Sequence, residues 1–581
     1  MPTPSTSGLT TPVALPKSGS LQAQTIAALL PDAPRKWGGP LGAGASVSYS
    51  FAWINGLPAL FDGPGNLPYS ELNEPGATYH YGFNAVQQAA ARSALSAWAA
   101  VANLGFQETP ESSQQVGDIR MAWTSATQTT SEGSKAWGWA GYPDSVWPSA
   151  GDIWLSTQAS GAKDNDWSVG SYNFYSLMHE QGHALGLKHP FQGAVQLGAT
   201  QDVRNYTVMS YDDPVASSWV TVSQTPSGGY SWSAKTVMPS TPMVGDVLAM
   251  QYLYGANTRA NAGNDVYDFD PALPFYKTLW DAQGQDTLSA ARFAQPCRIN
   301  LNEGSYSSLG FKSNWEQYAK LNWNSVPDPA TFYDGTNNLG IAWGVVIENA
   351  VGGSGNDTLI GNTANNRLVG GAGDDSLDGG LGDDTLEGDA GNDSLQGGLG
   401  TDTALYLGAR EAFTLSRTAT GWQVSDKSGA EGSDSLQGIE RLSFADRHVA
   451  LDLDGHAGAV AKVLGAVFGP IVVSTNPTLV GIGLYCMDDL GDSLQDLMGL
   501  ALQARLGSSP SSAQVVDLLY ANVVGSAPQA SVRQHFTDLL DQHKLTAVEL
   551  AVQAAQTTEN AARIELTGLL QTGLDYLPYT A

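Results

Sequence analysis

Six consecutive segments of nine residues, running from Gly352 to Leu405, constrain the fold of this chain more than any other feature. Glycine stands at position one and usually at position four of each segment, with an acid usually at position six and a leucine usually at position eight. Glycine permits tight turns with positive φ, and carboxylates and turn carbonyls are the hard oxygen ligands that Ca²⁺ prefers. The regular leucine can stack into a narrow core, which a flexible Gly/Asp-rich linker would not need. The period of nine therefore predicts a calcium-binding parallel β-roll.

The acids at position six are the predicted calcium ligands of this β-roll. They are Asp357, Asp375, Asp384, Asp393 and Asp402. The second segment has Asn366 at position six and Ala364 at position four, so we expect its sites to be weaker or absent. Over residues 352–405 ten acids stand against one base, Arg367. Because such a segment repels itself without calcium, we expect calcium binding and folding to be coupled.

A second pattern, His179-Glu180-x-x-His183-x-x-Gly186-x-x-His189, has the spacing of a zinc site. His179 and His183 are four residues apart, so on a helix they lie on one face and can occupy two corners of a tetrahedral zinc site. Gly186 lets the helix end in a conformation that residues with a Cβ avoid, so the chain can turn and bring in His189. Three protein ligands leave the fourth position to water, as in catalytic zinc sites. Glu180 can reach that water and act as general base.

The segment Asn-Tyr-Thr-Val-Met-Ser-Tyr, residues 205–211, follows the third histidine. A long zinc motif followed by a methionine turn is the metzincin pattern. "VMSY" together with "HALGLKHP" resembles the serralysin branch of that family. The resemblance implies that Met209 packs beneath the zinc histidines. It also implies that Tyr211 reaches the metal when substrate is absent and helps to stabilise the transition state.

Sequence pieces between the two patterns also resemble the serralysin β-roll domain. They are "LYGANTR", "WDAQGQDTL", "RINLNEGSYSSLG" and "GVVIENAVGGSGNDTL". In that family the same pieces form another calcium site, so the resemblance implies a second set of ligands here. These are Gly263, Asp265, Asp281, Asp286 and Glu348. The match is interrupted by added residues near Ala260 and by about 25 residues, 314–338, that look inserted.

We therefore predict a multidomain α+β chain with four parts. Residues 1–44, rich in Pro, Ser, Thr and Gly, are expected to be a flexible leader or short pro-segment. Residues 45–255 are expected to form a metzincin zinc protease domain, in which residues 217–240 resemble a polar loop. Residues 256–454 are expected to be the calcium-binding β-roll domain with its cap. In residues 455–581 Ala, Leu and Gln recur at helical periods, which predicts a mainly α-helical module, expected to carry a type I secretion signal.

The net charge of −29 argues against nucleic acid or an anionic membrane surface as a partner and favours divalent cations. No apolar run approaches the length of a membrane-spanning helix. The first residues lack the basic start and apolar core of a Sec signal peptide. Serralysins leave the bacterial cell through a one-step type I exporter that reads an uncleaved C-terminal signal. The resemblance therefore implies a secreted, extracellular protein, expected to be a monomer, whose partners are its protein substrates and the type I secretion machinery.

The resemblance implies a secreted zinc endopeptidase with one catalytic Zn²⁺ and several structural Ca²⁺ ions. In this reading His179, His183 and His189 hold the zinc, and Glu180 takes a proton from water and passes it to the leaving amine. Tyr211 hydrogen-bonds the developing oxyanion. The alternative is a calcium-dependent cell-surface or matrix-binding protein whose protease domain is inactive or latent. The intact Glu180 and the three histidines argue against this alternative.

Overall fold

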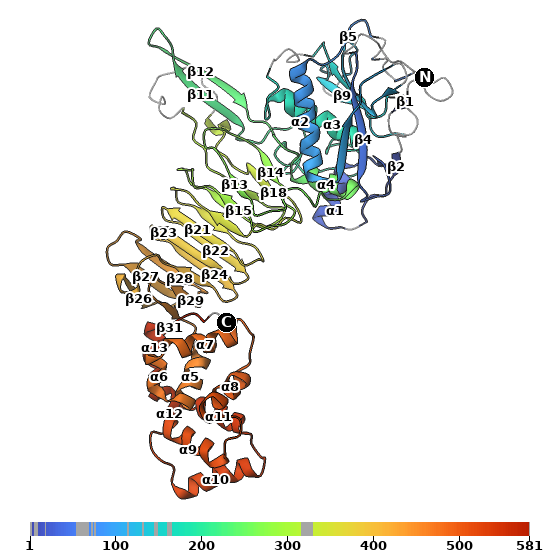
Figure 1. The fold of residues 1–581 in the computed structure, drawn as a ribbon. Coiled ribbons are helices and arrows are strands. Elements are labelled where there is room, and N and C mark those ends of the chain that lie inside the picture. The colour runs from blue at the N-terminus through green and yellow to red at the C-terminus, as the bar shows by residue number, and fades with distance from the viewer. Residues whose placement is uncertain are drawn as a thin grey trace. The chain divides into compact units, whose positions relative to one another are not determined.

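The computed structural model of this protein (Figure 1) describes residues 3, 4, 10–17, 19–53, 69, 70, 74, 77–112, 115–129, 133–144, 149–159, 166–314 and 329–579. They form two compact units, Met1–Ile347 and Glu348–Ala581. The first unit contains the histidine pattern, and the second contains the nine-residue repeats and the C-terminal helices. Each unit is described by itself below.

A mostly parallel sheet is the framework of the first unit. Its order is β6-β4-β8-β10-β9, with β5 paired to β8. The strands are β4 (Ala45–Phe51), β5 (His80–Tyr81), β6 (Leu104–Glu108), β8 (Ile119–Thr124), β9 (Gly138–Ala140) and β10 (Ile153–Ser156). β8 and β10 are buried along their whole length, as is typical of strands covered on both faces. β9 runs antiparallel to β10 and forms an edge of the sheet, so within the described part of the chain one of its sides has no strand partner.

Two of the helices in this unit, α2 (Ala85–Val101) and α3 (Tyr172–Ala184), pack against each other. The side chain of Ser171 caps α3 by accepting a hydrogen bond from a backbone N–H of its first turn. α2 contacts β6 and α3, and the indole of Trp98 on α2 donates to the carbonyl of Met178 on α3 at 3.2 Å. Every residue of α3 after the first is buried, so this helix runs through the interior of the domain.

The predicted flexible leader is wrong in its later part, because residues 21–37 pack into the first unit. Here α1 (Leu21–Leu29) contacts α4 (Val244–Tyr254), and β3 (Arg35–Trp37) pairs with β2 (Thr10–Pro12). Ala28, Leu29 and Leu30 have no exposed surface. This apolar stretch is short, but it is buried against the rest of the unit, which accounts for its order. The shorter pair β1 (Thr3–Pro4) and β7 (Gln115–Val116) lies elsewhere in the unit.

Residues 217–240, predicted to be a polar loop, form a β-hairpin instead. β11 (Ser218–Gln224) and β12 (Tyr230–Thr236) pair antiparallel along their full lengths. Gly228 in the connection has a φ of +82°, which glycine adopts without strain. Val220 and Val222 are buried and Thr221 between them is exposed, which is the period of two of a strand. The high Ser, Thr and Gly content hid this alternation in the sequence.

Short strands and an aromatic cluster complete the first unit. The strands are β13 (Val266–Asp268), β14 (Lys277–Leu279), β15 (Thr287–Ser289), β16 (Arg298–Asn300), β17 (Tyr306–Ser307) and β18 (Leu339–Ile341). The rings of Phe275 and Tyr333 both contact Phe311, with centroids 5.8 and 5.3 Å away. Trp219 at the base of the hairpin packs edge-on against Phe311 and Tyr333. The hairpin is therefore anchored on a buried aromatic core.

The predicted parallel β-roll is present in the second unit. One sheet has the order β19-β21-β23-β25-β29 and the other β20-β22-β24-β28. The strands of the repeats are β19 (Asn349–Val351), β20 (Thr358–Ile360), β21 (Arg367–Ala372), β22 (Ser376–Leu381), β23 (Thr385–Ala390), β24 (Ser394–Leu399) and β25 (Thr403–Leu405). Leu368 pairs with Leu386 and Leu377 with Leu395, so each coil contains two of the nine-residue segments. These leucines are at most 1% exposed and form the core of the roll.

A cap and a helical module follow the roll. The cap strands are β26 (Phe413–Arg417), β27 (Trp422–Asp426), β28 (Ser433–Gln437), β29 (Arg441–Ser443) and β30 (His448–Ala450). The helices are α5 (His456–Phe468), α6 (Pro470–Thr475), α7 (Pro477–Asp488), α8 (Leu494–Leu506), α9 (Ser512–Val523), α10 (Ala530–Asp541), α11 (Ala547–Ala555), α12 (Thr558–Arg563) and α13 (Leu566–Thr572). Val460, Met498 and Leu519 belong to their common core. The last strand, β31 (Leu574–Tyr576), pairs with β30, which joins the end of the described chain to the cap.

The predicted order of an α/β domain, a parallel β-roll and a helical module is thus present in the structure. Within the described residues, every helix is too short or too polar to cross a lipid bilayer.

Candidate active site

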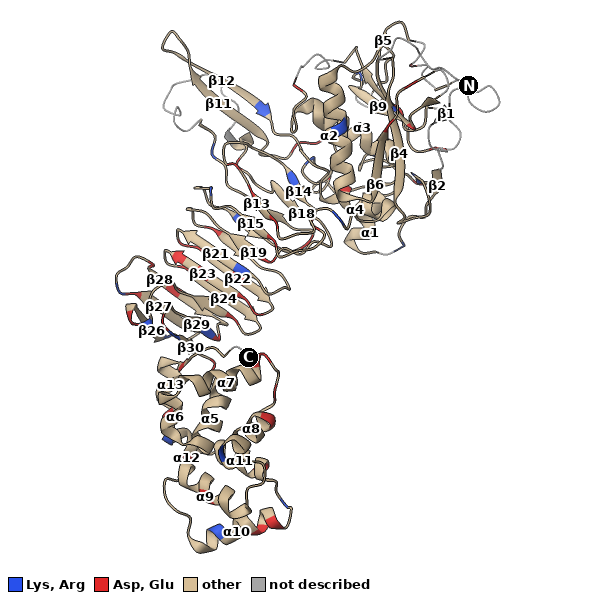
Figure 2. Ribbon diagram, viewed as in Figure 1, with Lys and Arg blue, Asp and Glu red and all other residues tan. Residues whose placement is uncertain are grey.

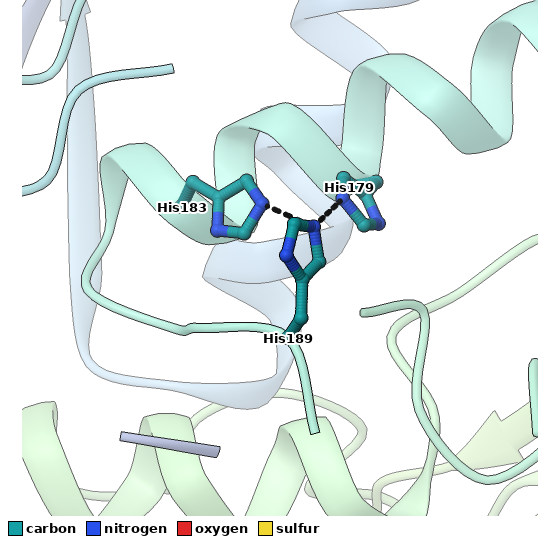
Figure 3. Close-up of side chains that lie close together, drawn as sticks. All are labelled: His179, His183 and His189. Carbon is teal, nitrogen blue, oxygen red and sulfur yellow. Dashed lines mark hydrogen bonds between the residues drawn. The ribbon is translucent and has the colours of Figure 1, made fainter. Parts of the chain in front are cut away.

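The three histidines of the zinc pattern converge in the first unit (Figure 3). His179 and His183 lie one turn apart on α3, and His189 follows a turn that contains Gly186, whose φ is +112°. The Nε2 atom of His189 is 3.1 Å from Nε2 of His179 and 3.0 Å from Nε2 of His183. Nitrogen ligands of a tetrahedral zinc ion, each about 2.1 Å from the metal, lie about 3.3 Å apart. The arrangement therefore fits three ligands of one zinc ion.

Hydrogen bonds to backbone carbonyls leave Nε2 as the ligand atom of two of these rings. Nδ1 of His179 lies 2.7 Å from the carbonyl oxygen of Val208, and Nδ1 of His183 lies 2.7 Å from that of Leu187. Each Nδ1 must therefore carry the proton, and each Nε2 a lone pair. Burial lowers the pKa of His179 to about 3 and that of His189 to about 4, and it also lowers the pKa of His183. Neutral imidazoles facing one point are the donor set that zinc requires.

Glu180 lies beside the histidines on α3 and is 6% exposed. Its Oε2 atom is buried and has no hydrogen-bond partner among the described residues. Burial raises the pKa of its carboxyl group to about 8. Its side chain packs against the edge strand β9, because a Cβ added at Gly138 would lie 3.5 Å from Cγ of Glu180. A carboxylate so placed can accept a proton from water held between it and the three histidines.

Met209 packs directly against α3. Gly182 directly precedes His183 on this helix. A Cβ added at Gly182 would lie 2.6 Å from Sδ of Met209, so only glycine permits this approach. The turn itself is fixed by the buried Asp246, which accepts hydrogen bonds from the Thr207 hydroxyl at 2.6 Å and the Val208 N–H at 2.7 Å. The carbonyl of Val208 in turn fixes a histidine ring. Hydrogen bonds therefore link the methionine turn to the orientation of the His179 ring.

Tyr211 lies at the mouth of the site. Its hydroxyl is 2.9 Å from Nε2 of His189, and its ring stacks on that of His179 with centroids 5.6 Å apart. The side chain is 45% exposed, so it can turn toward a bound molecule without disturbing the core. The hydroxyl is a donor that could reach an oxygen held at the histidines.

Lys188 links the third histidine to the N-terminal segment, and the sequence patterns did not predict this role. Its side chain is 4% exposed, and its Nζ donates to the carbonyls of Ala28, Gln192 and Val195. Its backbone N–H donates to the carbonyl of Leu29 at 2.8 Å. A lysine gives no sequence signal for such a position, because most lysines lie on the surface.

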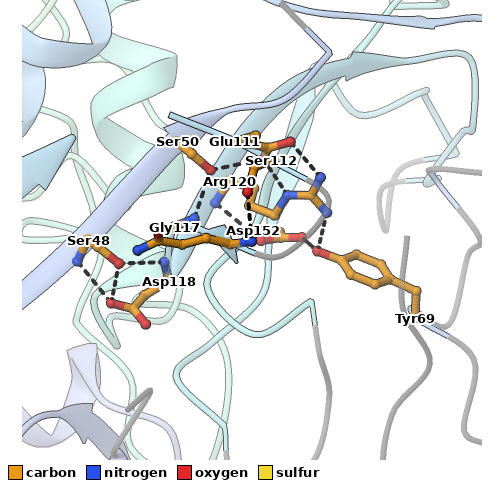
Figure 4. Close-up of polar contacts among 10 residues, drawn as sticks. Ser48, Ser50, Tyr69, Glu111, Ser112, Gly117, Asp118, Arg120 and Asp152 are labelled. Atoms are coloured by element: carbon orange, nitrogen blue, oxygen red, sulfur yellow. Dashed lines mark hydrogen bonds and ion pairs between the residues drawn. The ribbon is translucent and has the colours of Figure 1, made fainter. Parts of the chain in front are cut away.

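A buried polar cluster supports the strands beside the site (Figure 4). Arg120 on β8, which is 1% exposed, pairs with Glu111 at 2.6 Å and donates to the hydroxyl of Tyr69 at 2.8 Å. That hydroxyl donates to Asp152, whose backbone carbonyl accepts from the N–H of Gly141 at 3.0 Å. Asp152 directly precedes β10, and Gly141 directly follows β9. The cluster therefore fixes the edge strand, and its buried charges are paired, as burial requires.

The five predicted ligands of the β-roll lie in regular order along its coils and are at most 3% exposed. Oδ1 of Asp375 accepts from the N–H of Asp357 at 2.6 Å, Oδ1 of Asp393 from Asp375 at 2.8 Å, and Oδ1 of Asp402 from Asp384 at 2.9 Å. The Oδ2 atoms of Asp375, Asp384, Asp393 and Asp402 are buried without a hydrogen-bond partner in the described part of the chain. Buried carboxylate oxygens without donors fit Ca²⁺ ligands. Figure 2 shows acidic residues along the coils of the roll.

The degenerate second segment differs from its neighbours. Oδ1 of Asn366 accepts from the N–H of Asn362 at 2.7 Å, and its Nδ2 donates to the carbonyl of Glu348 at 3.0 Å. Both ends of the Asn366 amide thus have hydrogen-bond partners within the protein. A carboxylate at this position would need a cation. This supports the prediction of a weaker site there.

Two cap carboxylates continue the ladder and were missed in the sequence. Oδ1 of Asp434 accepts from the N–H of Asp393, and Oε2 of Glu440 accepts from the N–H of Asp402, both at 3.0 Å. A signal for the first was present, because residues 432–437, GSDSLQ, repeat the pattern GNDSLQ of the fifth repeat. The intervening hairpin of the cap separates it from the period of nine.

The second predicted calcium set is brought together in part. Carboxylate oxygens of Asp265, Asp281 and Asp286 lie within 4.8 Å of one another in the first unit. The carbonyl of Gly263 and Oδ1 of Asp286 both lie close to Gly284, since a Cβ there would be 2.0 and 2.7 Å from them. Glu348, the fifth predicted ligand, belongs to the second unit, so its place in this calcium site stays a prediction.

Family models match three parts of the chain. Residues 72–216 match Matrixin, and residues 249–319 match Peptidase M10 serralysin C terminal. Residues 351–386 and 378–404 match the RTX calcium-binding nonapeptide repeat. The matches cover the zinc pattern, the start of the second calcium set and the repeats.

Several relatives are serralysins or related metallopeptidases. The chain is 35% identical over 300 residues to a serralysin of Photorhabdus luminescens, covering 48% of this chain and 53% of that protein. It is 35% identical over 329 residues to serralysin B of Dickeya chrysanthemi, covering 52% and 60%. It is 33% identical over 316 residues to the metallopeptidase AprA of Pseudomonas marginalis, covering 50% and 57%. The chain thus spans little more than half the length of these relatives.

The fold and the site define a metzincin domain followed by a calcium-binding β-roll and a helical module. The predicted resemblance is confirmed: the chain contains a matrixin domain, a serralysin C-terminal region and RTX repeats, and it is a homologue of serralysins.

Proposed function

We propose that this protein is a secreted zinc endopeptidase that hydrolyses internal peptide bonds of extracellular proteins. The observation that carries the proposal is the convergence of three neutral histidine Nε2 atoms beside a buried glutamate oxygen, which has no hydrogen-bond partner among the residues that the structure describes. His179, His183 and His189 would hold one Zn²⁺. When bound, Zn²⁺ supplies a Lewis acid that polarises a carbonyl and makes water a stronger acid.

The remaining chemistry belongs to residues of this chain. Glu180 accepts the proton of the attacking water at its carboxylate and then donates it to the leaving nitrogen of the peptide. Tyr211 turns away from His189 and donates a hydrogen bond to the oxygen on which negative charge develops. Met209 and Asp246 hold α3 and the methionine turn in fixed positions. Glu180 and Tyr211 therefore do not have to be ordered during the reaction.

The edge strand β9 supports an extended peptide as the substrate. Its free side can add a further strand by main-chain hydrogen bonds, which depend little on side chains. Gly138 at the start of β9 is in contact with Glu180, so a peptide along this edge would pass the candidate base. Protein segments that can become extended are therefore the proposed substrates.

Calcium is proposed to stabilise the roll through Asp357, Asp375, Asp384, Asp393 and Asp402. Asp265, Asp281 and Asp286, with Gly263 and Glu348, are proposed as a further site. We keep the division into residues 45–255, 256–454 and 455–581 as the proposed domains. The proposed route is export through type I secretion machinery to the extracellular space, where the protein acts as a monomer.

The deciding experiment compares the wild type with Glu180→Ala in calcium-containing buffer, with casein as substrate and the zinc content of each protein measured. The wild type should cleave casein, and the variant should retain zinc and lose cleavage. A zinc-loaded wild type that cleaves nothing would contradict the endopeptidase proposal. It would favour a calcium-dependent surface-binding protein on a protease scaffold.

A further inference from the structure

A cavity of about 690 Å³ lies beside the start of the zinc helix in the first unit. Its walls come from residues 166–172, which lead into α3, from residues 235–240 at the end of β12, and from residues 268–277 between β13 and β14. The three histidines, Glu180 and Tyr211 are not part of its lining. We call it the hairpin cavity.

The hairpin wall lies outside the stretches that the family models match. Residues 217–248 lie between the stretches that match Matrixin and the serralysin C terminus. The predicted insertion also holds the hairpin in place: Asn314 accepts from the N–H of Val222 at 2.7 Å and donates to its carbonyl at 2.8 Å. The N–H of Tyr333 donates to the carbonyl of Ser218 at 2.9 Å. Asn314 and Tyr333 therefore hold the hairpin that forms one side of this cavity.

Two lysines line the cavity, the exposed Lys235 and the half-buried Lys277. Nζ of Lys277 lies 5.4 Å from the ring centroid of Phe275 and 5.8 Å from that of Phe269. Within the described residues no carboxylate forms an ion pair with it. Burial lowers the pKa of Lys277, which reflects the cost of holding this charge away from water.

The acids that line the cavity are already occupied by other groups. Asp166 accepts hydrogen bonds from the N–H and hydroxyl of Ser168. Asp268 and Asp270 lie 3.7 and 3.5 Å from the guanidinium of Arg292. Asp166 also attracts the exposed Lys235. The half-buried Lys277 is therefore the lining cation that lacks an acidic partner among the described residues, and the complementary ligand group is a carboxylate.

The cavity has apolar surface at its mouth and lies within reach of the reaction. Val169, Tyr172 and Leu273 are 59%, 44% and 65% exposed. Tyr172 precedes His179 by seven residues of helix, or about 10 Å. An extended peptide advances about 3.3 Å per residue. A side chain in the cavity would thus belong to a residue at least about three positions from the cleaved bond.

We infer that the hairpin cavity binds an acidic side chain of the substrate polypeptide, about three to five residues from the cleaved bond, with Lys277 as its counter-charge. The inference rests on the proposed endopeptidase function and adds its substrate class, which is extended segments that carry Asp or Glu at this distance. The exposed apolar residues at the mouth contact the stem of the acidic side chain and its neighbours. A half-buried charge pair of this kind favours Glu over Gln by about 5- to 20-fold.

A binding experiment tests the cavity without catalysis. Fluorescent peptides in which Glu or Gln scans the positions around a central apolar residue are titrated by anisotropy into zinc-loaded Glu180→Ala protein. One position should prefer Glu by about 5- to 20-fold, and Lys277→Met on the same background should remove that preference. Lys17→Met, at an exposed lysine of the same unit, should keep it. No Glu preference at any position, or a preference that survives Lys277→Met, would overturn the inference.

Cleavage of the same peptides by the otherwise unsubstituted protein separates this inference from the proposed function. Peptides too short to reach the cavity should be cut equally by the wild type and Lys277→Met, while long acidic peptides should lose kcat/KM in the variant. Cleavage with no acidic preference would refute the cavity and leave the endopeptidase intact. Binding through Lys277 without any cleavage would refute the endopeptidase and retain a carboxylate-binding cavity. Circular dichroism and zinc content verify that the variant is folded.

Discussion

At the scale of single residues, Lys188 is the clearest determinant of the candidate zinc site outside the three histidines themselves. Its ammonium joins carbonyls of the N-terminal segment to the turn that carries His189. Lys188→Met would leave these carbonyls without a donor. We expect zinc affinity to fall by about 10- to 100-fold and the free energy of unfolding by about 1–3 kcal/mol, measured by chelator competition and by thermal denaturation.

Lys36→Met is the matched control for this prediction. Lys36 is also buried, and its Nζ donates to the carbonyls of Trp37, Gly39 and Ala43, all at 2.9 Å. Because those carbonyls lie outside the histidine turn, the variant should lose stability and keep its zinc affinity. An equal loss of zinc affinity in both variants would show that Lys188 acts only through general stability.

Gly182 allows a second test at this scale. Gly182→Ala places a Cβ only 2.6 Å from Sδ of Met209, so the helix and the methionine turn must move apart. We expect a loss of about 1–3 kcal/mol in unfolding free energy, the usual cost of overpacking a core, together with lower zinc occupancy. Gly198→Ala, where an added Cβ would meet nothing within 4 Å, should have neither effect. Chemical denaturation measures the unfolding free energy of the two variants, and metal analysis measures their zinc occupancy.

At the scale of elements, α1 packs into the first unit, so its removal should destabilise that unit. It buries Ile26, Leu29 and Leu30, and burial of each such side chain is worth about 1.5–3 kcal/mol. Deletion of residues 1–30 should therefore lower the melting temperature and the zinc affinity of the protein. Deletion of residues 1–9 should have a much smaller effect. A longer deletion that leaves both quantities unchanged would restore the idea of a dispensable leader.

These elements differ in how well they could be predicted from the sequence. The zinc helix and the β-roll could be predicted because their spacings are local: His179 and His183 are one turn apart, and the roll repeats every nine residues. The order of α1 depends on burial against α4, which lies far away in the chain. The hairpin is stabilised at its base by Trp219 against distant aromatic rings. Lys188 was missed for the same reason, because its carbonyl partners come from two separate segments.

At the scale of the whole molecule, the net charge of −29 is partly concentrated in a roll whose carboxylates are buried beside one another. In the absence of metal, burial first and neighbouring carboxylates second raise the pKa of Asp375 and Asp384 to about 7. Burial likewise raises the pKa of Asp402 to about 6 and that of Asp434 to about 7. At neutral pH the calcium-free roll must therefore hold costly charges, which Ca²⁺ would neutralise.

The stability of the calcium-free roll should depend on pH. Because the folded-state pKa values lie above the ordinary aspartate value of about 3.9, the folded, calcium-free roll binds protons more tightly than the unfolded chain. The stability gained from these protons is complete below about pH 4 and is lost as the pH rises through 6 to 7. In EDTA, the melting temperature of the second unit should thus fall between pH 5 and pH 8, as followed by circular dichroism of the full-length protein. Saturating calcium should remove this fall, because the metal then neutralises the carboxylates.

Asp384→Asn should flatten the pH dependence of the melting temperature in EDTA. Glu411→Gln, at an exposed position outside the ladder, should leave that dependence unchanged. A melting temperature in EDTA that rises with pH would show that these carboxylates are not the groups calcium stabilises.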